Sequence, residues 1–237
     1  GRVARALGHG QYLVELAPGT DLAAAIVKLR GQPGIESVEP DLIMYPAVVP
    51  NDPEYTKQYH LPLISAPAGW DVVTGGPVVI AVIDSGVDLD HPDIAANLWV
   101  NLGETPKNGR DDDKNGYVDD VNGWDFYHNN NNPNPTPNGK DENFDGEPDE
   151  QVSHGTLVSG LAAAVTNNGY GVAGVSWGAK IMALQVFPDD GGTAVSTVID
   201  AVNYAVANGA DIINLSIGGG YTSAFTAPFS AAYAAGC

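Results

Sequence analysis

Two residues in the sequence could form a proton-transfer pair. Asp84 follows the apolar run 78–83, and His154 precedes a stretch of small residues in which we predict a helix. A half-buried carboxylate needs a hydrogen-bond donor or a positive charge, and a histidine at a helix N-terminus needs a carboxylate to offset the helix dipole. Alone, each fits a simpler interpretation, a turn aspartate or a solvated capping histidine. Together they predict a general base, His154, oriented by Asp84.

A second group of residues has the chemistry of a metal site. Residues 104–150 contain 13 acidic and 4 basic residues, a net charge of −9 in 47 positions, and the pattern D-x-[DN]-x-[DN]-G-x-x-D occurs there twice, 30 positions apart. Oxygen-bearing side chains at positions 1, 3, 5 and 9, with glycine at position 6, suit a calcium loop. The predicted calcium ligands are Asp111, Asp113, Asn115 and Asp119 in the first loop, and Asp141, Asn143, Asp145 and Asp149 in the second.

Neither of the two loops has the glutamate that an EF-hand places at position 12, where Asn122 and Val152 stand instead. The alternative interpretation of this segment is therefore an acidic, solvated loop of Asn, Asp and Pro that binds no ion.

The elements that position these residues alternate between apolar strands and amphipathic helices. We predict strands at 78–83, 180–186 and 212–217, and helices at 155–165 and 195–207. This alternation predicts an α/β fold with a mostly parallel sheet and helices on both faces. Ligands of such sheets bind beyond the carboxyl ends of the strands, which is where the sequence places Asp84.

The N-terminal region has a different pattern. A strand at 10–16, a helix capped near Asp21 and a short strand at 35–38 predict a small β-α-β unit, which is short for an independent domain. Residues 46–56 contain three prolines and no periodicity, so they predict a linker. We therefore expect a small α+β unit at 1–45, a linker at 46–56 and the main α/β domain at 57–237.

The composition excludes several classes of function. Ten Lys and Arg residues against 29 Asp and Glu residues give a net charge of −19, which repels polyanions, so nucleic acid is not an expected partner. The apolar runs are strand-sized and far short of the roughly 20 residues that span a membrane. The single cysteine, Cys237, excludes an intrachain disulfide and a cysteine-based zinc site. No G-x-G-x-x-G follows a predicted strand, which argues against dinucleotide binding.

The combination of motifs resembles the subtilisin-like serine proteases. The segments VIDSGVDLDHPD around Asp84, SHGTLVSG around His154 and NLSIGGG at 214–220 occur in the order of that family's Asp and His motifs and its substrate-binding segment. The resemblance implies a subtilisin-like fold in which Asp84 orients His154 and His154 takes the proton of a serine hydroxyl. It also implies that peptide substrates pair as an added strand with Asn214, Leu215, Ser216, Ile217, Gly218 and Gly219.

The same resemblance extends to other parts of the chain. Residues 11–43 resemble the carboxyl half of the family's propeptide, a folding chaperone and inhibitor, so 1–45 is expected to be a propeptide remnant with a processing region in 46–56. By family analogy, a third calcium site is expected at Asp93 and Asn168. Calcium loops and an acidic charge fit a secreted, extracellular enzyme.

One part of the family's pattern is missing from these residues. The nucleophile motif, Gly-Thr-Ser followed shortly by Pro, does not occur in the 237 residues, and neither does the Ala-Ala-Gly-Asn segment that supplies an oxyanion donor. We therefore expect a serine endopeptidase acting on protein or peptide substrates, whose serine lies beyond residue 237 and whose 237-residue part is inactive alone. The alternative is a non-catalytic, protease-like protein that binds peptides or calcium.

Overall fold

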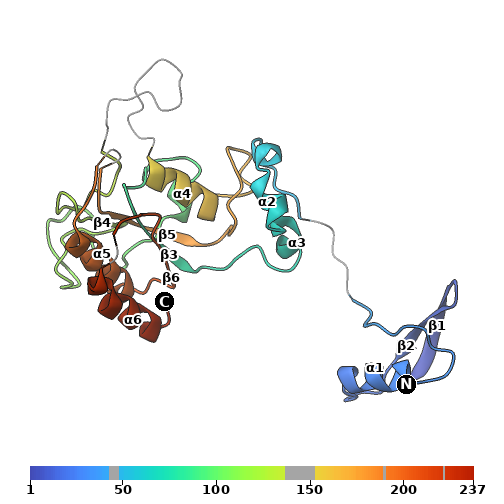
Figure 1. Cartoon of the computed structure of the whole chain (residues 1–237). Helices are drawn as coiled ribbons and strands as arrows, with labels where there is room; N and C mark the ends of the chain where they lie inside the picture. The colour runs from blue at the N-terminus through green and yellow to red at the C-terminus, as the bar shows by residue number, and fades with distance from the viewer. Residues whose placement is uncertain (43–47, 137–152, 189–190, 221) are drawn as a thin grey trace. The chain divides into compact units, whose positions relative to one another are not determined.

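The structure, a computed structural model, describes residues 1–42, 48–136, 153–188, 191–220 and 222–237. The chain divides into two compact units, Gly1–Pro46 and Ala47–Cys237. Figure 1 shows the elements of both units, and each unit is described by itself below.

The first unit is a hairpin followed by a helix. Strands β1 (Arg2–Gly8) and β2 (Gln11–Glu15) pair antiparallel, and α1 (Leu22–Arg30) begins after Asp21, whose side chain accepts a hydrogen bond from the Ala24 amide at 2.7 Å. The predicted helix is confirmed, but the strand predicted at 35–38 is wrong, because those residues form neither helix nor strand. Strand β2 pairs instead with the preceding segment through a two-residue turn, which costs less loop-closure entropy.

The second unit contains a four-stranded parallel sheet. Its strands are β3 (Val79–Asp84), β4 (Gly123–Asp125), β5 (Lys180–Gln185) and β6 (Ile212–Asn214), and they lie in the order β4-β5-β3-β6. The predicted parallel α/β sheet is confirmed. The strand predicted at 212–217 is shorter than expected and ends at Asn214, and Asp84 is the last residue of β3.

Helices cover both faces of this sheet, as predicted. Helix α4 (His154–Ala163) packs on the face that carries Ile80 and Val82, whereas α5 (Val195–Ala207) packs on the opposite face with Ile83. Figure 1 shows α4 on one side of the sheet and α5, with α6 (Thr226–Ala235) beside it, on the other. Successive side chains of a strand point to opposite faces, so both layers are buried by the same strands.

Short helical segments complete the second unit. Leu61, Trp70 and Ala173 form a separate small core, in which the rings of Trp70 and Trp177 lie 5.4 Å apart. In the part of the chain that the structure describes, no helix is long and apolar enough to cross a bilayer. The short segments are η1 (Tyr55–Lys57), α2 (His60–Leu63), α3 (Ala66–Trp70), η2 (Ala95–Asn97) and η3 (Ser223–Phe225).

Candidate active site

Asp84 lies at the carboxyl end of β3 and is fully buried. Its Oδ1 accepts a hydrogen bond from the Ser85 amide at 2.7 Å. The strand carries the side chain to the carboxyl end of the sheet, where α4 begins. The buried carboxylate therefore meets hydrogen-bond donors from the loop after β3 and from the start of α4. Such partners satisfy the lone pairs of the buried carboxylate, as burial of a polar group requires.

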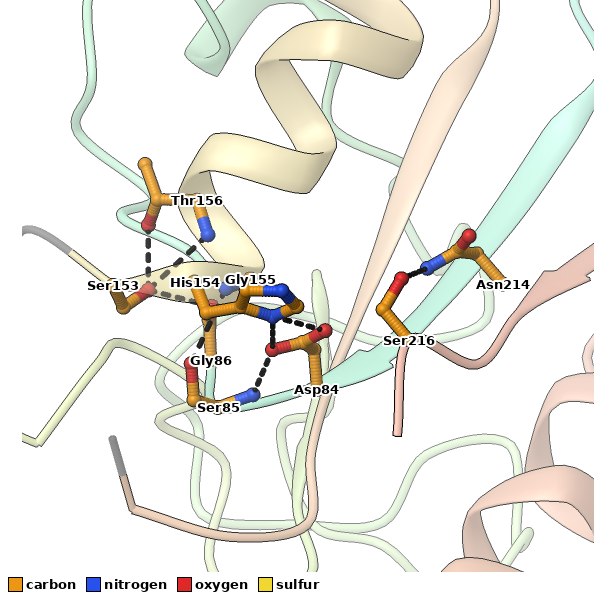
Figure 2. Close-up of polar contacts among 9 residues, drawn as sticks. All are labelled: Asp84, Ser85, Gly86, Ser153, His154, Gly155, Thr156, Asn214 and Ser216. Carbon is orange, nitrogen blue, oxygen red and sulfur yellow. Dashed lines mark hydrogen bonds and ion pairs between the residues drawn. The ribbon is translucent and has the colours of Figure 1, made fainter. Parts of the chain in front are cut away.

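His154 is the first residue of α4 and pairs with Asp84. Its Nδ1 lies 2.9 Å from Oδ1 and 3.0 Å from Oδ2 of that carboxylate, and its side chain is 54% exposed (Figure 2). Because an ionised carboxylate only accepts hydrogen bonds, this geometry selects the tautomer that carries the proton on Nδ1. The lone pair of Nε2 is then available as a base. The structure brings together the two residues predicted to act as a pair.

The two segments approach each other closely because Gly155 has no side chain. A Cβ at this position would lie 2.2 Å from the Gly86 carbonyl oxygen and 3.1 Å from the Asp84 Cβ. The Gly155 amide also donates a hydrogen bond to the Ser85 Oγ at 3.2 Å. The contact between the His and Asp motifs therefore depends on glycine immediately after His154.

The predicted substrate-binding segment follows the edge strand β6. Asn214 is the last residue of β6, and the Asn214 Nδ2 donates to the Ser216 Oγ at 3.0 Å (Figure 2). β6 pairs only with β3 among the strands that the structure describes, and the side chain of Leu215 packs against the core. Ser216, Ile217, Gly218 and Gly219 are exposed. An exposed segment at a sheet edge can accept a further strand.

The first acidic loop brings part of its predicted ligand set together. Carboxylate oxygens of Asp111, Asp113 and Glu104 lie within 4.8 Å of one another. The Asp119 carboxylate lies outside this group and accepts hydrogen bonds from the backbone amides of Asn108 and Gly109, at 3.0 and 2.9 Å. The Asn115 Oδ1 accepts one from the Tyr117 amide at 2.8 Å. Three carboxylates this close suit a hard cation with oxygen ligands.

Next to this cluster, a buried carboxylate anchors the acidic loop. Asp120 is 0% exposed and accepts hydrogen bonds from the Tyr204 hydroxyl and from the side-chain amides of Asn101 and Asn115, both at 2.9 Å. Burial, and then the hydrogen bond to Asp120, raise the pKa of Tyr204 above its ordinary value. The phenol therefore stays protonated and donates to the carboxylate.

The two residues of the third predicted metal site, Asp93 and Asn168, are joined by a hydrogen bond. Asn168 Nδ2 donates to Asp93 Oδ1 at 2.8 Å, and the Val172 amide donates to Asp93 Oδ2 at 2.8 Å. The backbone amide of Asn168 donates to Asp52 Oδ1 at 3.3 Å, so Asn168 joins two buried carboxylates, Asp93 and Asp52. The predicted second calcium loop, with Asp141, Asn143, Asp145 and Asp149, lies outside the described residues.

Two acidic residues of these groups were not predicted from the sequence. Glu104 precedes the first D-x-[DN] repeat by seven positions, and Asp52 lies in the predicted linker. Within the acidic segment, Glu104 had no spacing that set it apart. Asp52 had a weak signal, because a lone carboxylate between prolines is also typical of a turn.

Comparison with known proteins places the chain in a family. The profile of the subtilase family matches residues 75–235, about two thirds of the sequence. The chain is 34% identical over 171 residues to thermitase from Thermoactinomyces vulgaris, and 33% identical over 234 residues to an extracellular basic protease from Dichelobacter nodosus. These alignments cover 72% and 90% of this chain. The chain belongs to the subtilase family.

A solved structure agrees with this assignment. A protease from Pseudoalteromonas arctica PAMC 21717 is 28% identical, with a TM-score of 0.60, over 80% of this chain and 57% of that one. The chain spans about half or less of the curated relatives it matches, 48% of thermitase and 37% of the Dichelobacter protease.

The close approach at Gly155 can be tested by comparing two glycines of α4. Gly155→Ala should destabilise the protein by about 1–3 kcal/mol, because the added methyl group meets the Gly86 carbonyl. Gly160→Ala should instead stabilise it by about 0.5–1 kcal/mol, since no atom outside the local helix lies within 4 Å of the new Cβ. The measurement is urea unfolding of both variants. Equal effects of the two substitutions would contradict the contact.

Proposed function

We propose that this chain supplies the aspartate and the histidine of the catalytic triad of a serine endopeptidase. The observation that carries the proposal is the pair of short contacts between His154 Nδ1 and the buried Asp84 carboxylate, at 2.9 and 3.0 Å. His154 Nε2 takes the proton from a serine hydroxyl as its oxygen attacks the scissile carbonyl, and returns it to the leaving amine. Asp84 holds the tautomer and stabilises the imidazolium.

The serine belongs, in this proposal, to a segment beyond residue 237, because the 237 residues contain no Gly-Thr-Ser motif. Protein or peptide substrates pair in extended form with residues 214–219, whose glycines allow close backbone approach. Two matched relatives are named extracellular proteases, which supports secretion. Nucleic acid and membranes are not proposed as partners, in view of the net charge of −19.

A non-catalytic role is the second candidate function. It is favoured by one observation, the lack of the nucleophile motif in this sequence. A protease-like protein of this kind would bind peptides at 214–219, or calcium at the acidic loop, without hydrolysis. Kinetic measurements on a longer protein, which includes the residues encoded downstream of residue 237, distinguish the two candidates.

The proposed pair predicts the kinetics of that longer protein. His154→Ala should lower kcat by about 10⁴- to 10⁶-fold, and Asp84→Asn by about 10⁴-fold, because a base in the wrong tautomer still leaves other catalytic groups in place. His128→Ala is the matched control, since His128 also pairs with a buried carboxylate, Asp125, at 2.8 Å. Its kcat should be nearly unchanged. A loss of a hundredfold or less in His154→Ala would mean that another residue is the base.

We further propose that calcium stabilises the acidic segment. Repulsion among Glu104, Asp111 and Asp113 opposes their close packing, and a divalent cation with oxygen ligands offsets it. The second repeat at 141–149 and the pair of Asp93 with Asn168 are the further proposed sites. Bound calcium would supply positive charge that orders these loops and would take no part in the hydrolysis.

Calcium should therefore raise the melting temperature. Binding to the folded loop alone stabilises a protein by about 2.7 kcal/mol at a hundredfold excess over Kd. Asp113→Asn should reduce this calcium-dependent gain, whereas Asp112→Asn, next to the cluster but outside it, should keep it. Melting curves with calcium and with chelator, at matched ionic strength, make the comparison. Identical curves for the unmodified protein would show that the loop is only a solvated surface.

We also propose that residues 1–45 are a propeptide remnant that inhibits the catalytic unit and is removed by cleavage within 46–56. None of the described residues of this first unit is buried, and apolar side chains such as Val3, Tyr12 and Val27 are 64%, 61% and 72% exposed. A unit without its own core gains stability by packing on a partner.

Mass spectrometry of the purified active enzyme should find a new N-terminus within 46–56, because the boundary between the two compact units of the chain lies at the start of this segment. The His154→Ala variant serves as the control. It should retain the N-terminal unit if the enzyme processes itself. Active enzyme with residues 10–45 still covalently attached would contradict the proposal.

A further inference from the structure

Two buried hydroxyl groups join the segments that carry Asp84 and His154. Ser153 is 0% exposed and Thr156 is 8% exposed. The Ser153 Oγ donates to the Gly86 carbonyl at 3.1 Å and lies 2.9 Å from the Thr156 Oγ1, which accepts a hydrogen bond from the Asp88 amide at 2.9 Å. Figure 2 shows these hydroxyls to the left of the first turn of α4, with the Asp84–His154 pair to their right.

The proton positions in this network follow from the acceptors. A carbonyl oxygen cannot donate, so the single proton of the Ser153 hydroxyl is used on Gly86. The contact between the two hydroxyls must then be donated by Thr156. The result is a directed chain that starts at the Asp88 amide, passes through Thr156 and Ser153, and ends at the Gly86 carbonyl. Hydrogen bonds in such a chain polarise and strengthen one another.

This chain starts and ends in the same short segment, immediately after Asp84. It therefore clamps residues 86–88 to the first turn of α4, the turn that begins with His154. Capping of the helix needs only part of this network, the hydrogen bond that Ser153 Oγ accepts from the Thr156 amide at 3.1 Å. The hydroxyl of Thr156 and the contact with Gly86 serve no capping role.

We propose that Ser153 and Thr156 are positioning residues that hold His154 at hydrogen-bonding distance from Asp84. The inference rests on the proposed function only for its kinetic consequence, because the clamp acts on the Asp–His pair whether or not a serine is present. Loss of the clamp loosens the segment after Asp84 relative to the helix and opens the bond at Nδ1 to solvent.

The test is the exchange rate of the His154 Nδ1 proton with solvent, measured by NMR on the ¹⁵N-labelled 237-residue chain. Thr156→Val keeps the shape of the side chain and removes the hydroxyl, so exchange should become about tenfold faster, as loss of one ordinary hydrogen bond predicts. Thr156→Ser keeps the hydroxyl, so the exchange rate in this variant should stay as slow as in the wild-type chain.

Thr166→Val is the matched control for general loss of a threonine hydroxyl. Thr166 Oγ1 likewise accepts from a backbone amide, Gly174 at 2.9 Å, and donates to a carbonyl, Ala164 at 3.1 Å, but lies beyond the other end of α4. This variant should leave the exchange rate of the His154 proton unchanged. A similar acceleration in Thr166→Val would overturn the proposal, because the effect would then be one of stability alone.

Ser153→Gly separates the clamp from the cap, and carries the test if Thr156→Val does not fold. Glycine is itself a favourable N-cap residue, so the variant keeps the helix start while it removes the clamp, and exchange at His154 should accelerate about tenfold. Unchanged exchange in both Ser153→Gly and Thr156→Val would overturn the proposal, as would a wild-type chain without a protected Nδ1 proton.

In the longer protein, both variants should lower kcat with KM nearly unchanged, since residues 214–219 are not altered. A protein that shows no hydrolysis in any form, with slow Nδ1 exchange restored by Thr156→Ser, would refute the proposed function and leave the clamp intact. Normal kcat together with fast exchange would refute the positioning role and leave the proposed function intact.

Discussion

The close approach of the α4 N-terminus to the loop after β3 is the constraint on which the rest of the site depends. Gly155 and Gly86 face each other across this contact, and neither position has room for a side chain. Gly86 also has a φ of +102°, and a Cβ there would lie 2.9 Å from the Pro133 carbonyl oxygen. Three segments far apart in sequence therefore meet around two glycines, and the Asp84–His154 hydrogen bonds form only because they do.

The packing of α4 on the sheet explains how this approach is reached. The buried residues of the helix are Gly155, Thr156, Ser159 and Ala163, and three of them, Gly155, Ser159 and Ala163, recur at intervals of four. The distance between a helix and its neighbour is set by the side chains at the contact, so this face brings the helix near to β3. Apolar β3 and β5 side chains complete the layer. The same residues that looked featureless in the sequence thus determine where His154 lies.

Much of the second unit could be predicted from hydrophobic periodicity, because its strands and helices are long enough to carry a pattern. The prediction for α5, residues 195–207, has the observed ends, and Asp84 with His154 could be identified as a pair from their motifs. The three-residue strand β4 has no period to detect, and α6 contains few polar residues to mark a face. Pairing of β2 with β1 was missed since it depends on a turn with positive φ at His9 and Gly10 rather than on alternation.

The acidic cluster of Glu104, Asp111 and Asp113 illustrates a different limit. The repeat predicted Asp111, Asp113 and Asp119, whereas the group of close carboxylates contains Asp111, Asp113 and Glu104. A spacing rule assigns carboxylates to a loop, whereas in the folded loop backbone amides also bond them, as the amides of Asn115 and Gly116 do with Asp111 and that of Asp112 does with Glu104. Backbone amides compete for carboxylates wherever a turn leaves them without partners, and that competition is decided by tertiary structure.

The position of the acidic loop argues for a structural role of any ion it binds. The loop is attached to the face of the sheet that α5 covers, through the hydrogen bond of Tyr204 to Asp120 and the packing of the Tyr117 and Tyr204 rings, 4.9 Å apart. His154 belongs to α4, on the opposite face. A change of packing at the cluster therefore reaches the Asp–His pair only through the sheet itself. Because strands of a packed sheet move little, an ion in the loop changes how firmly the α5 layer is held and not how His154 meets Asp84.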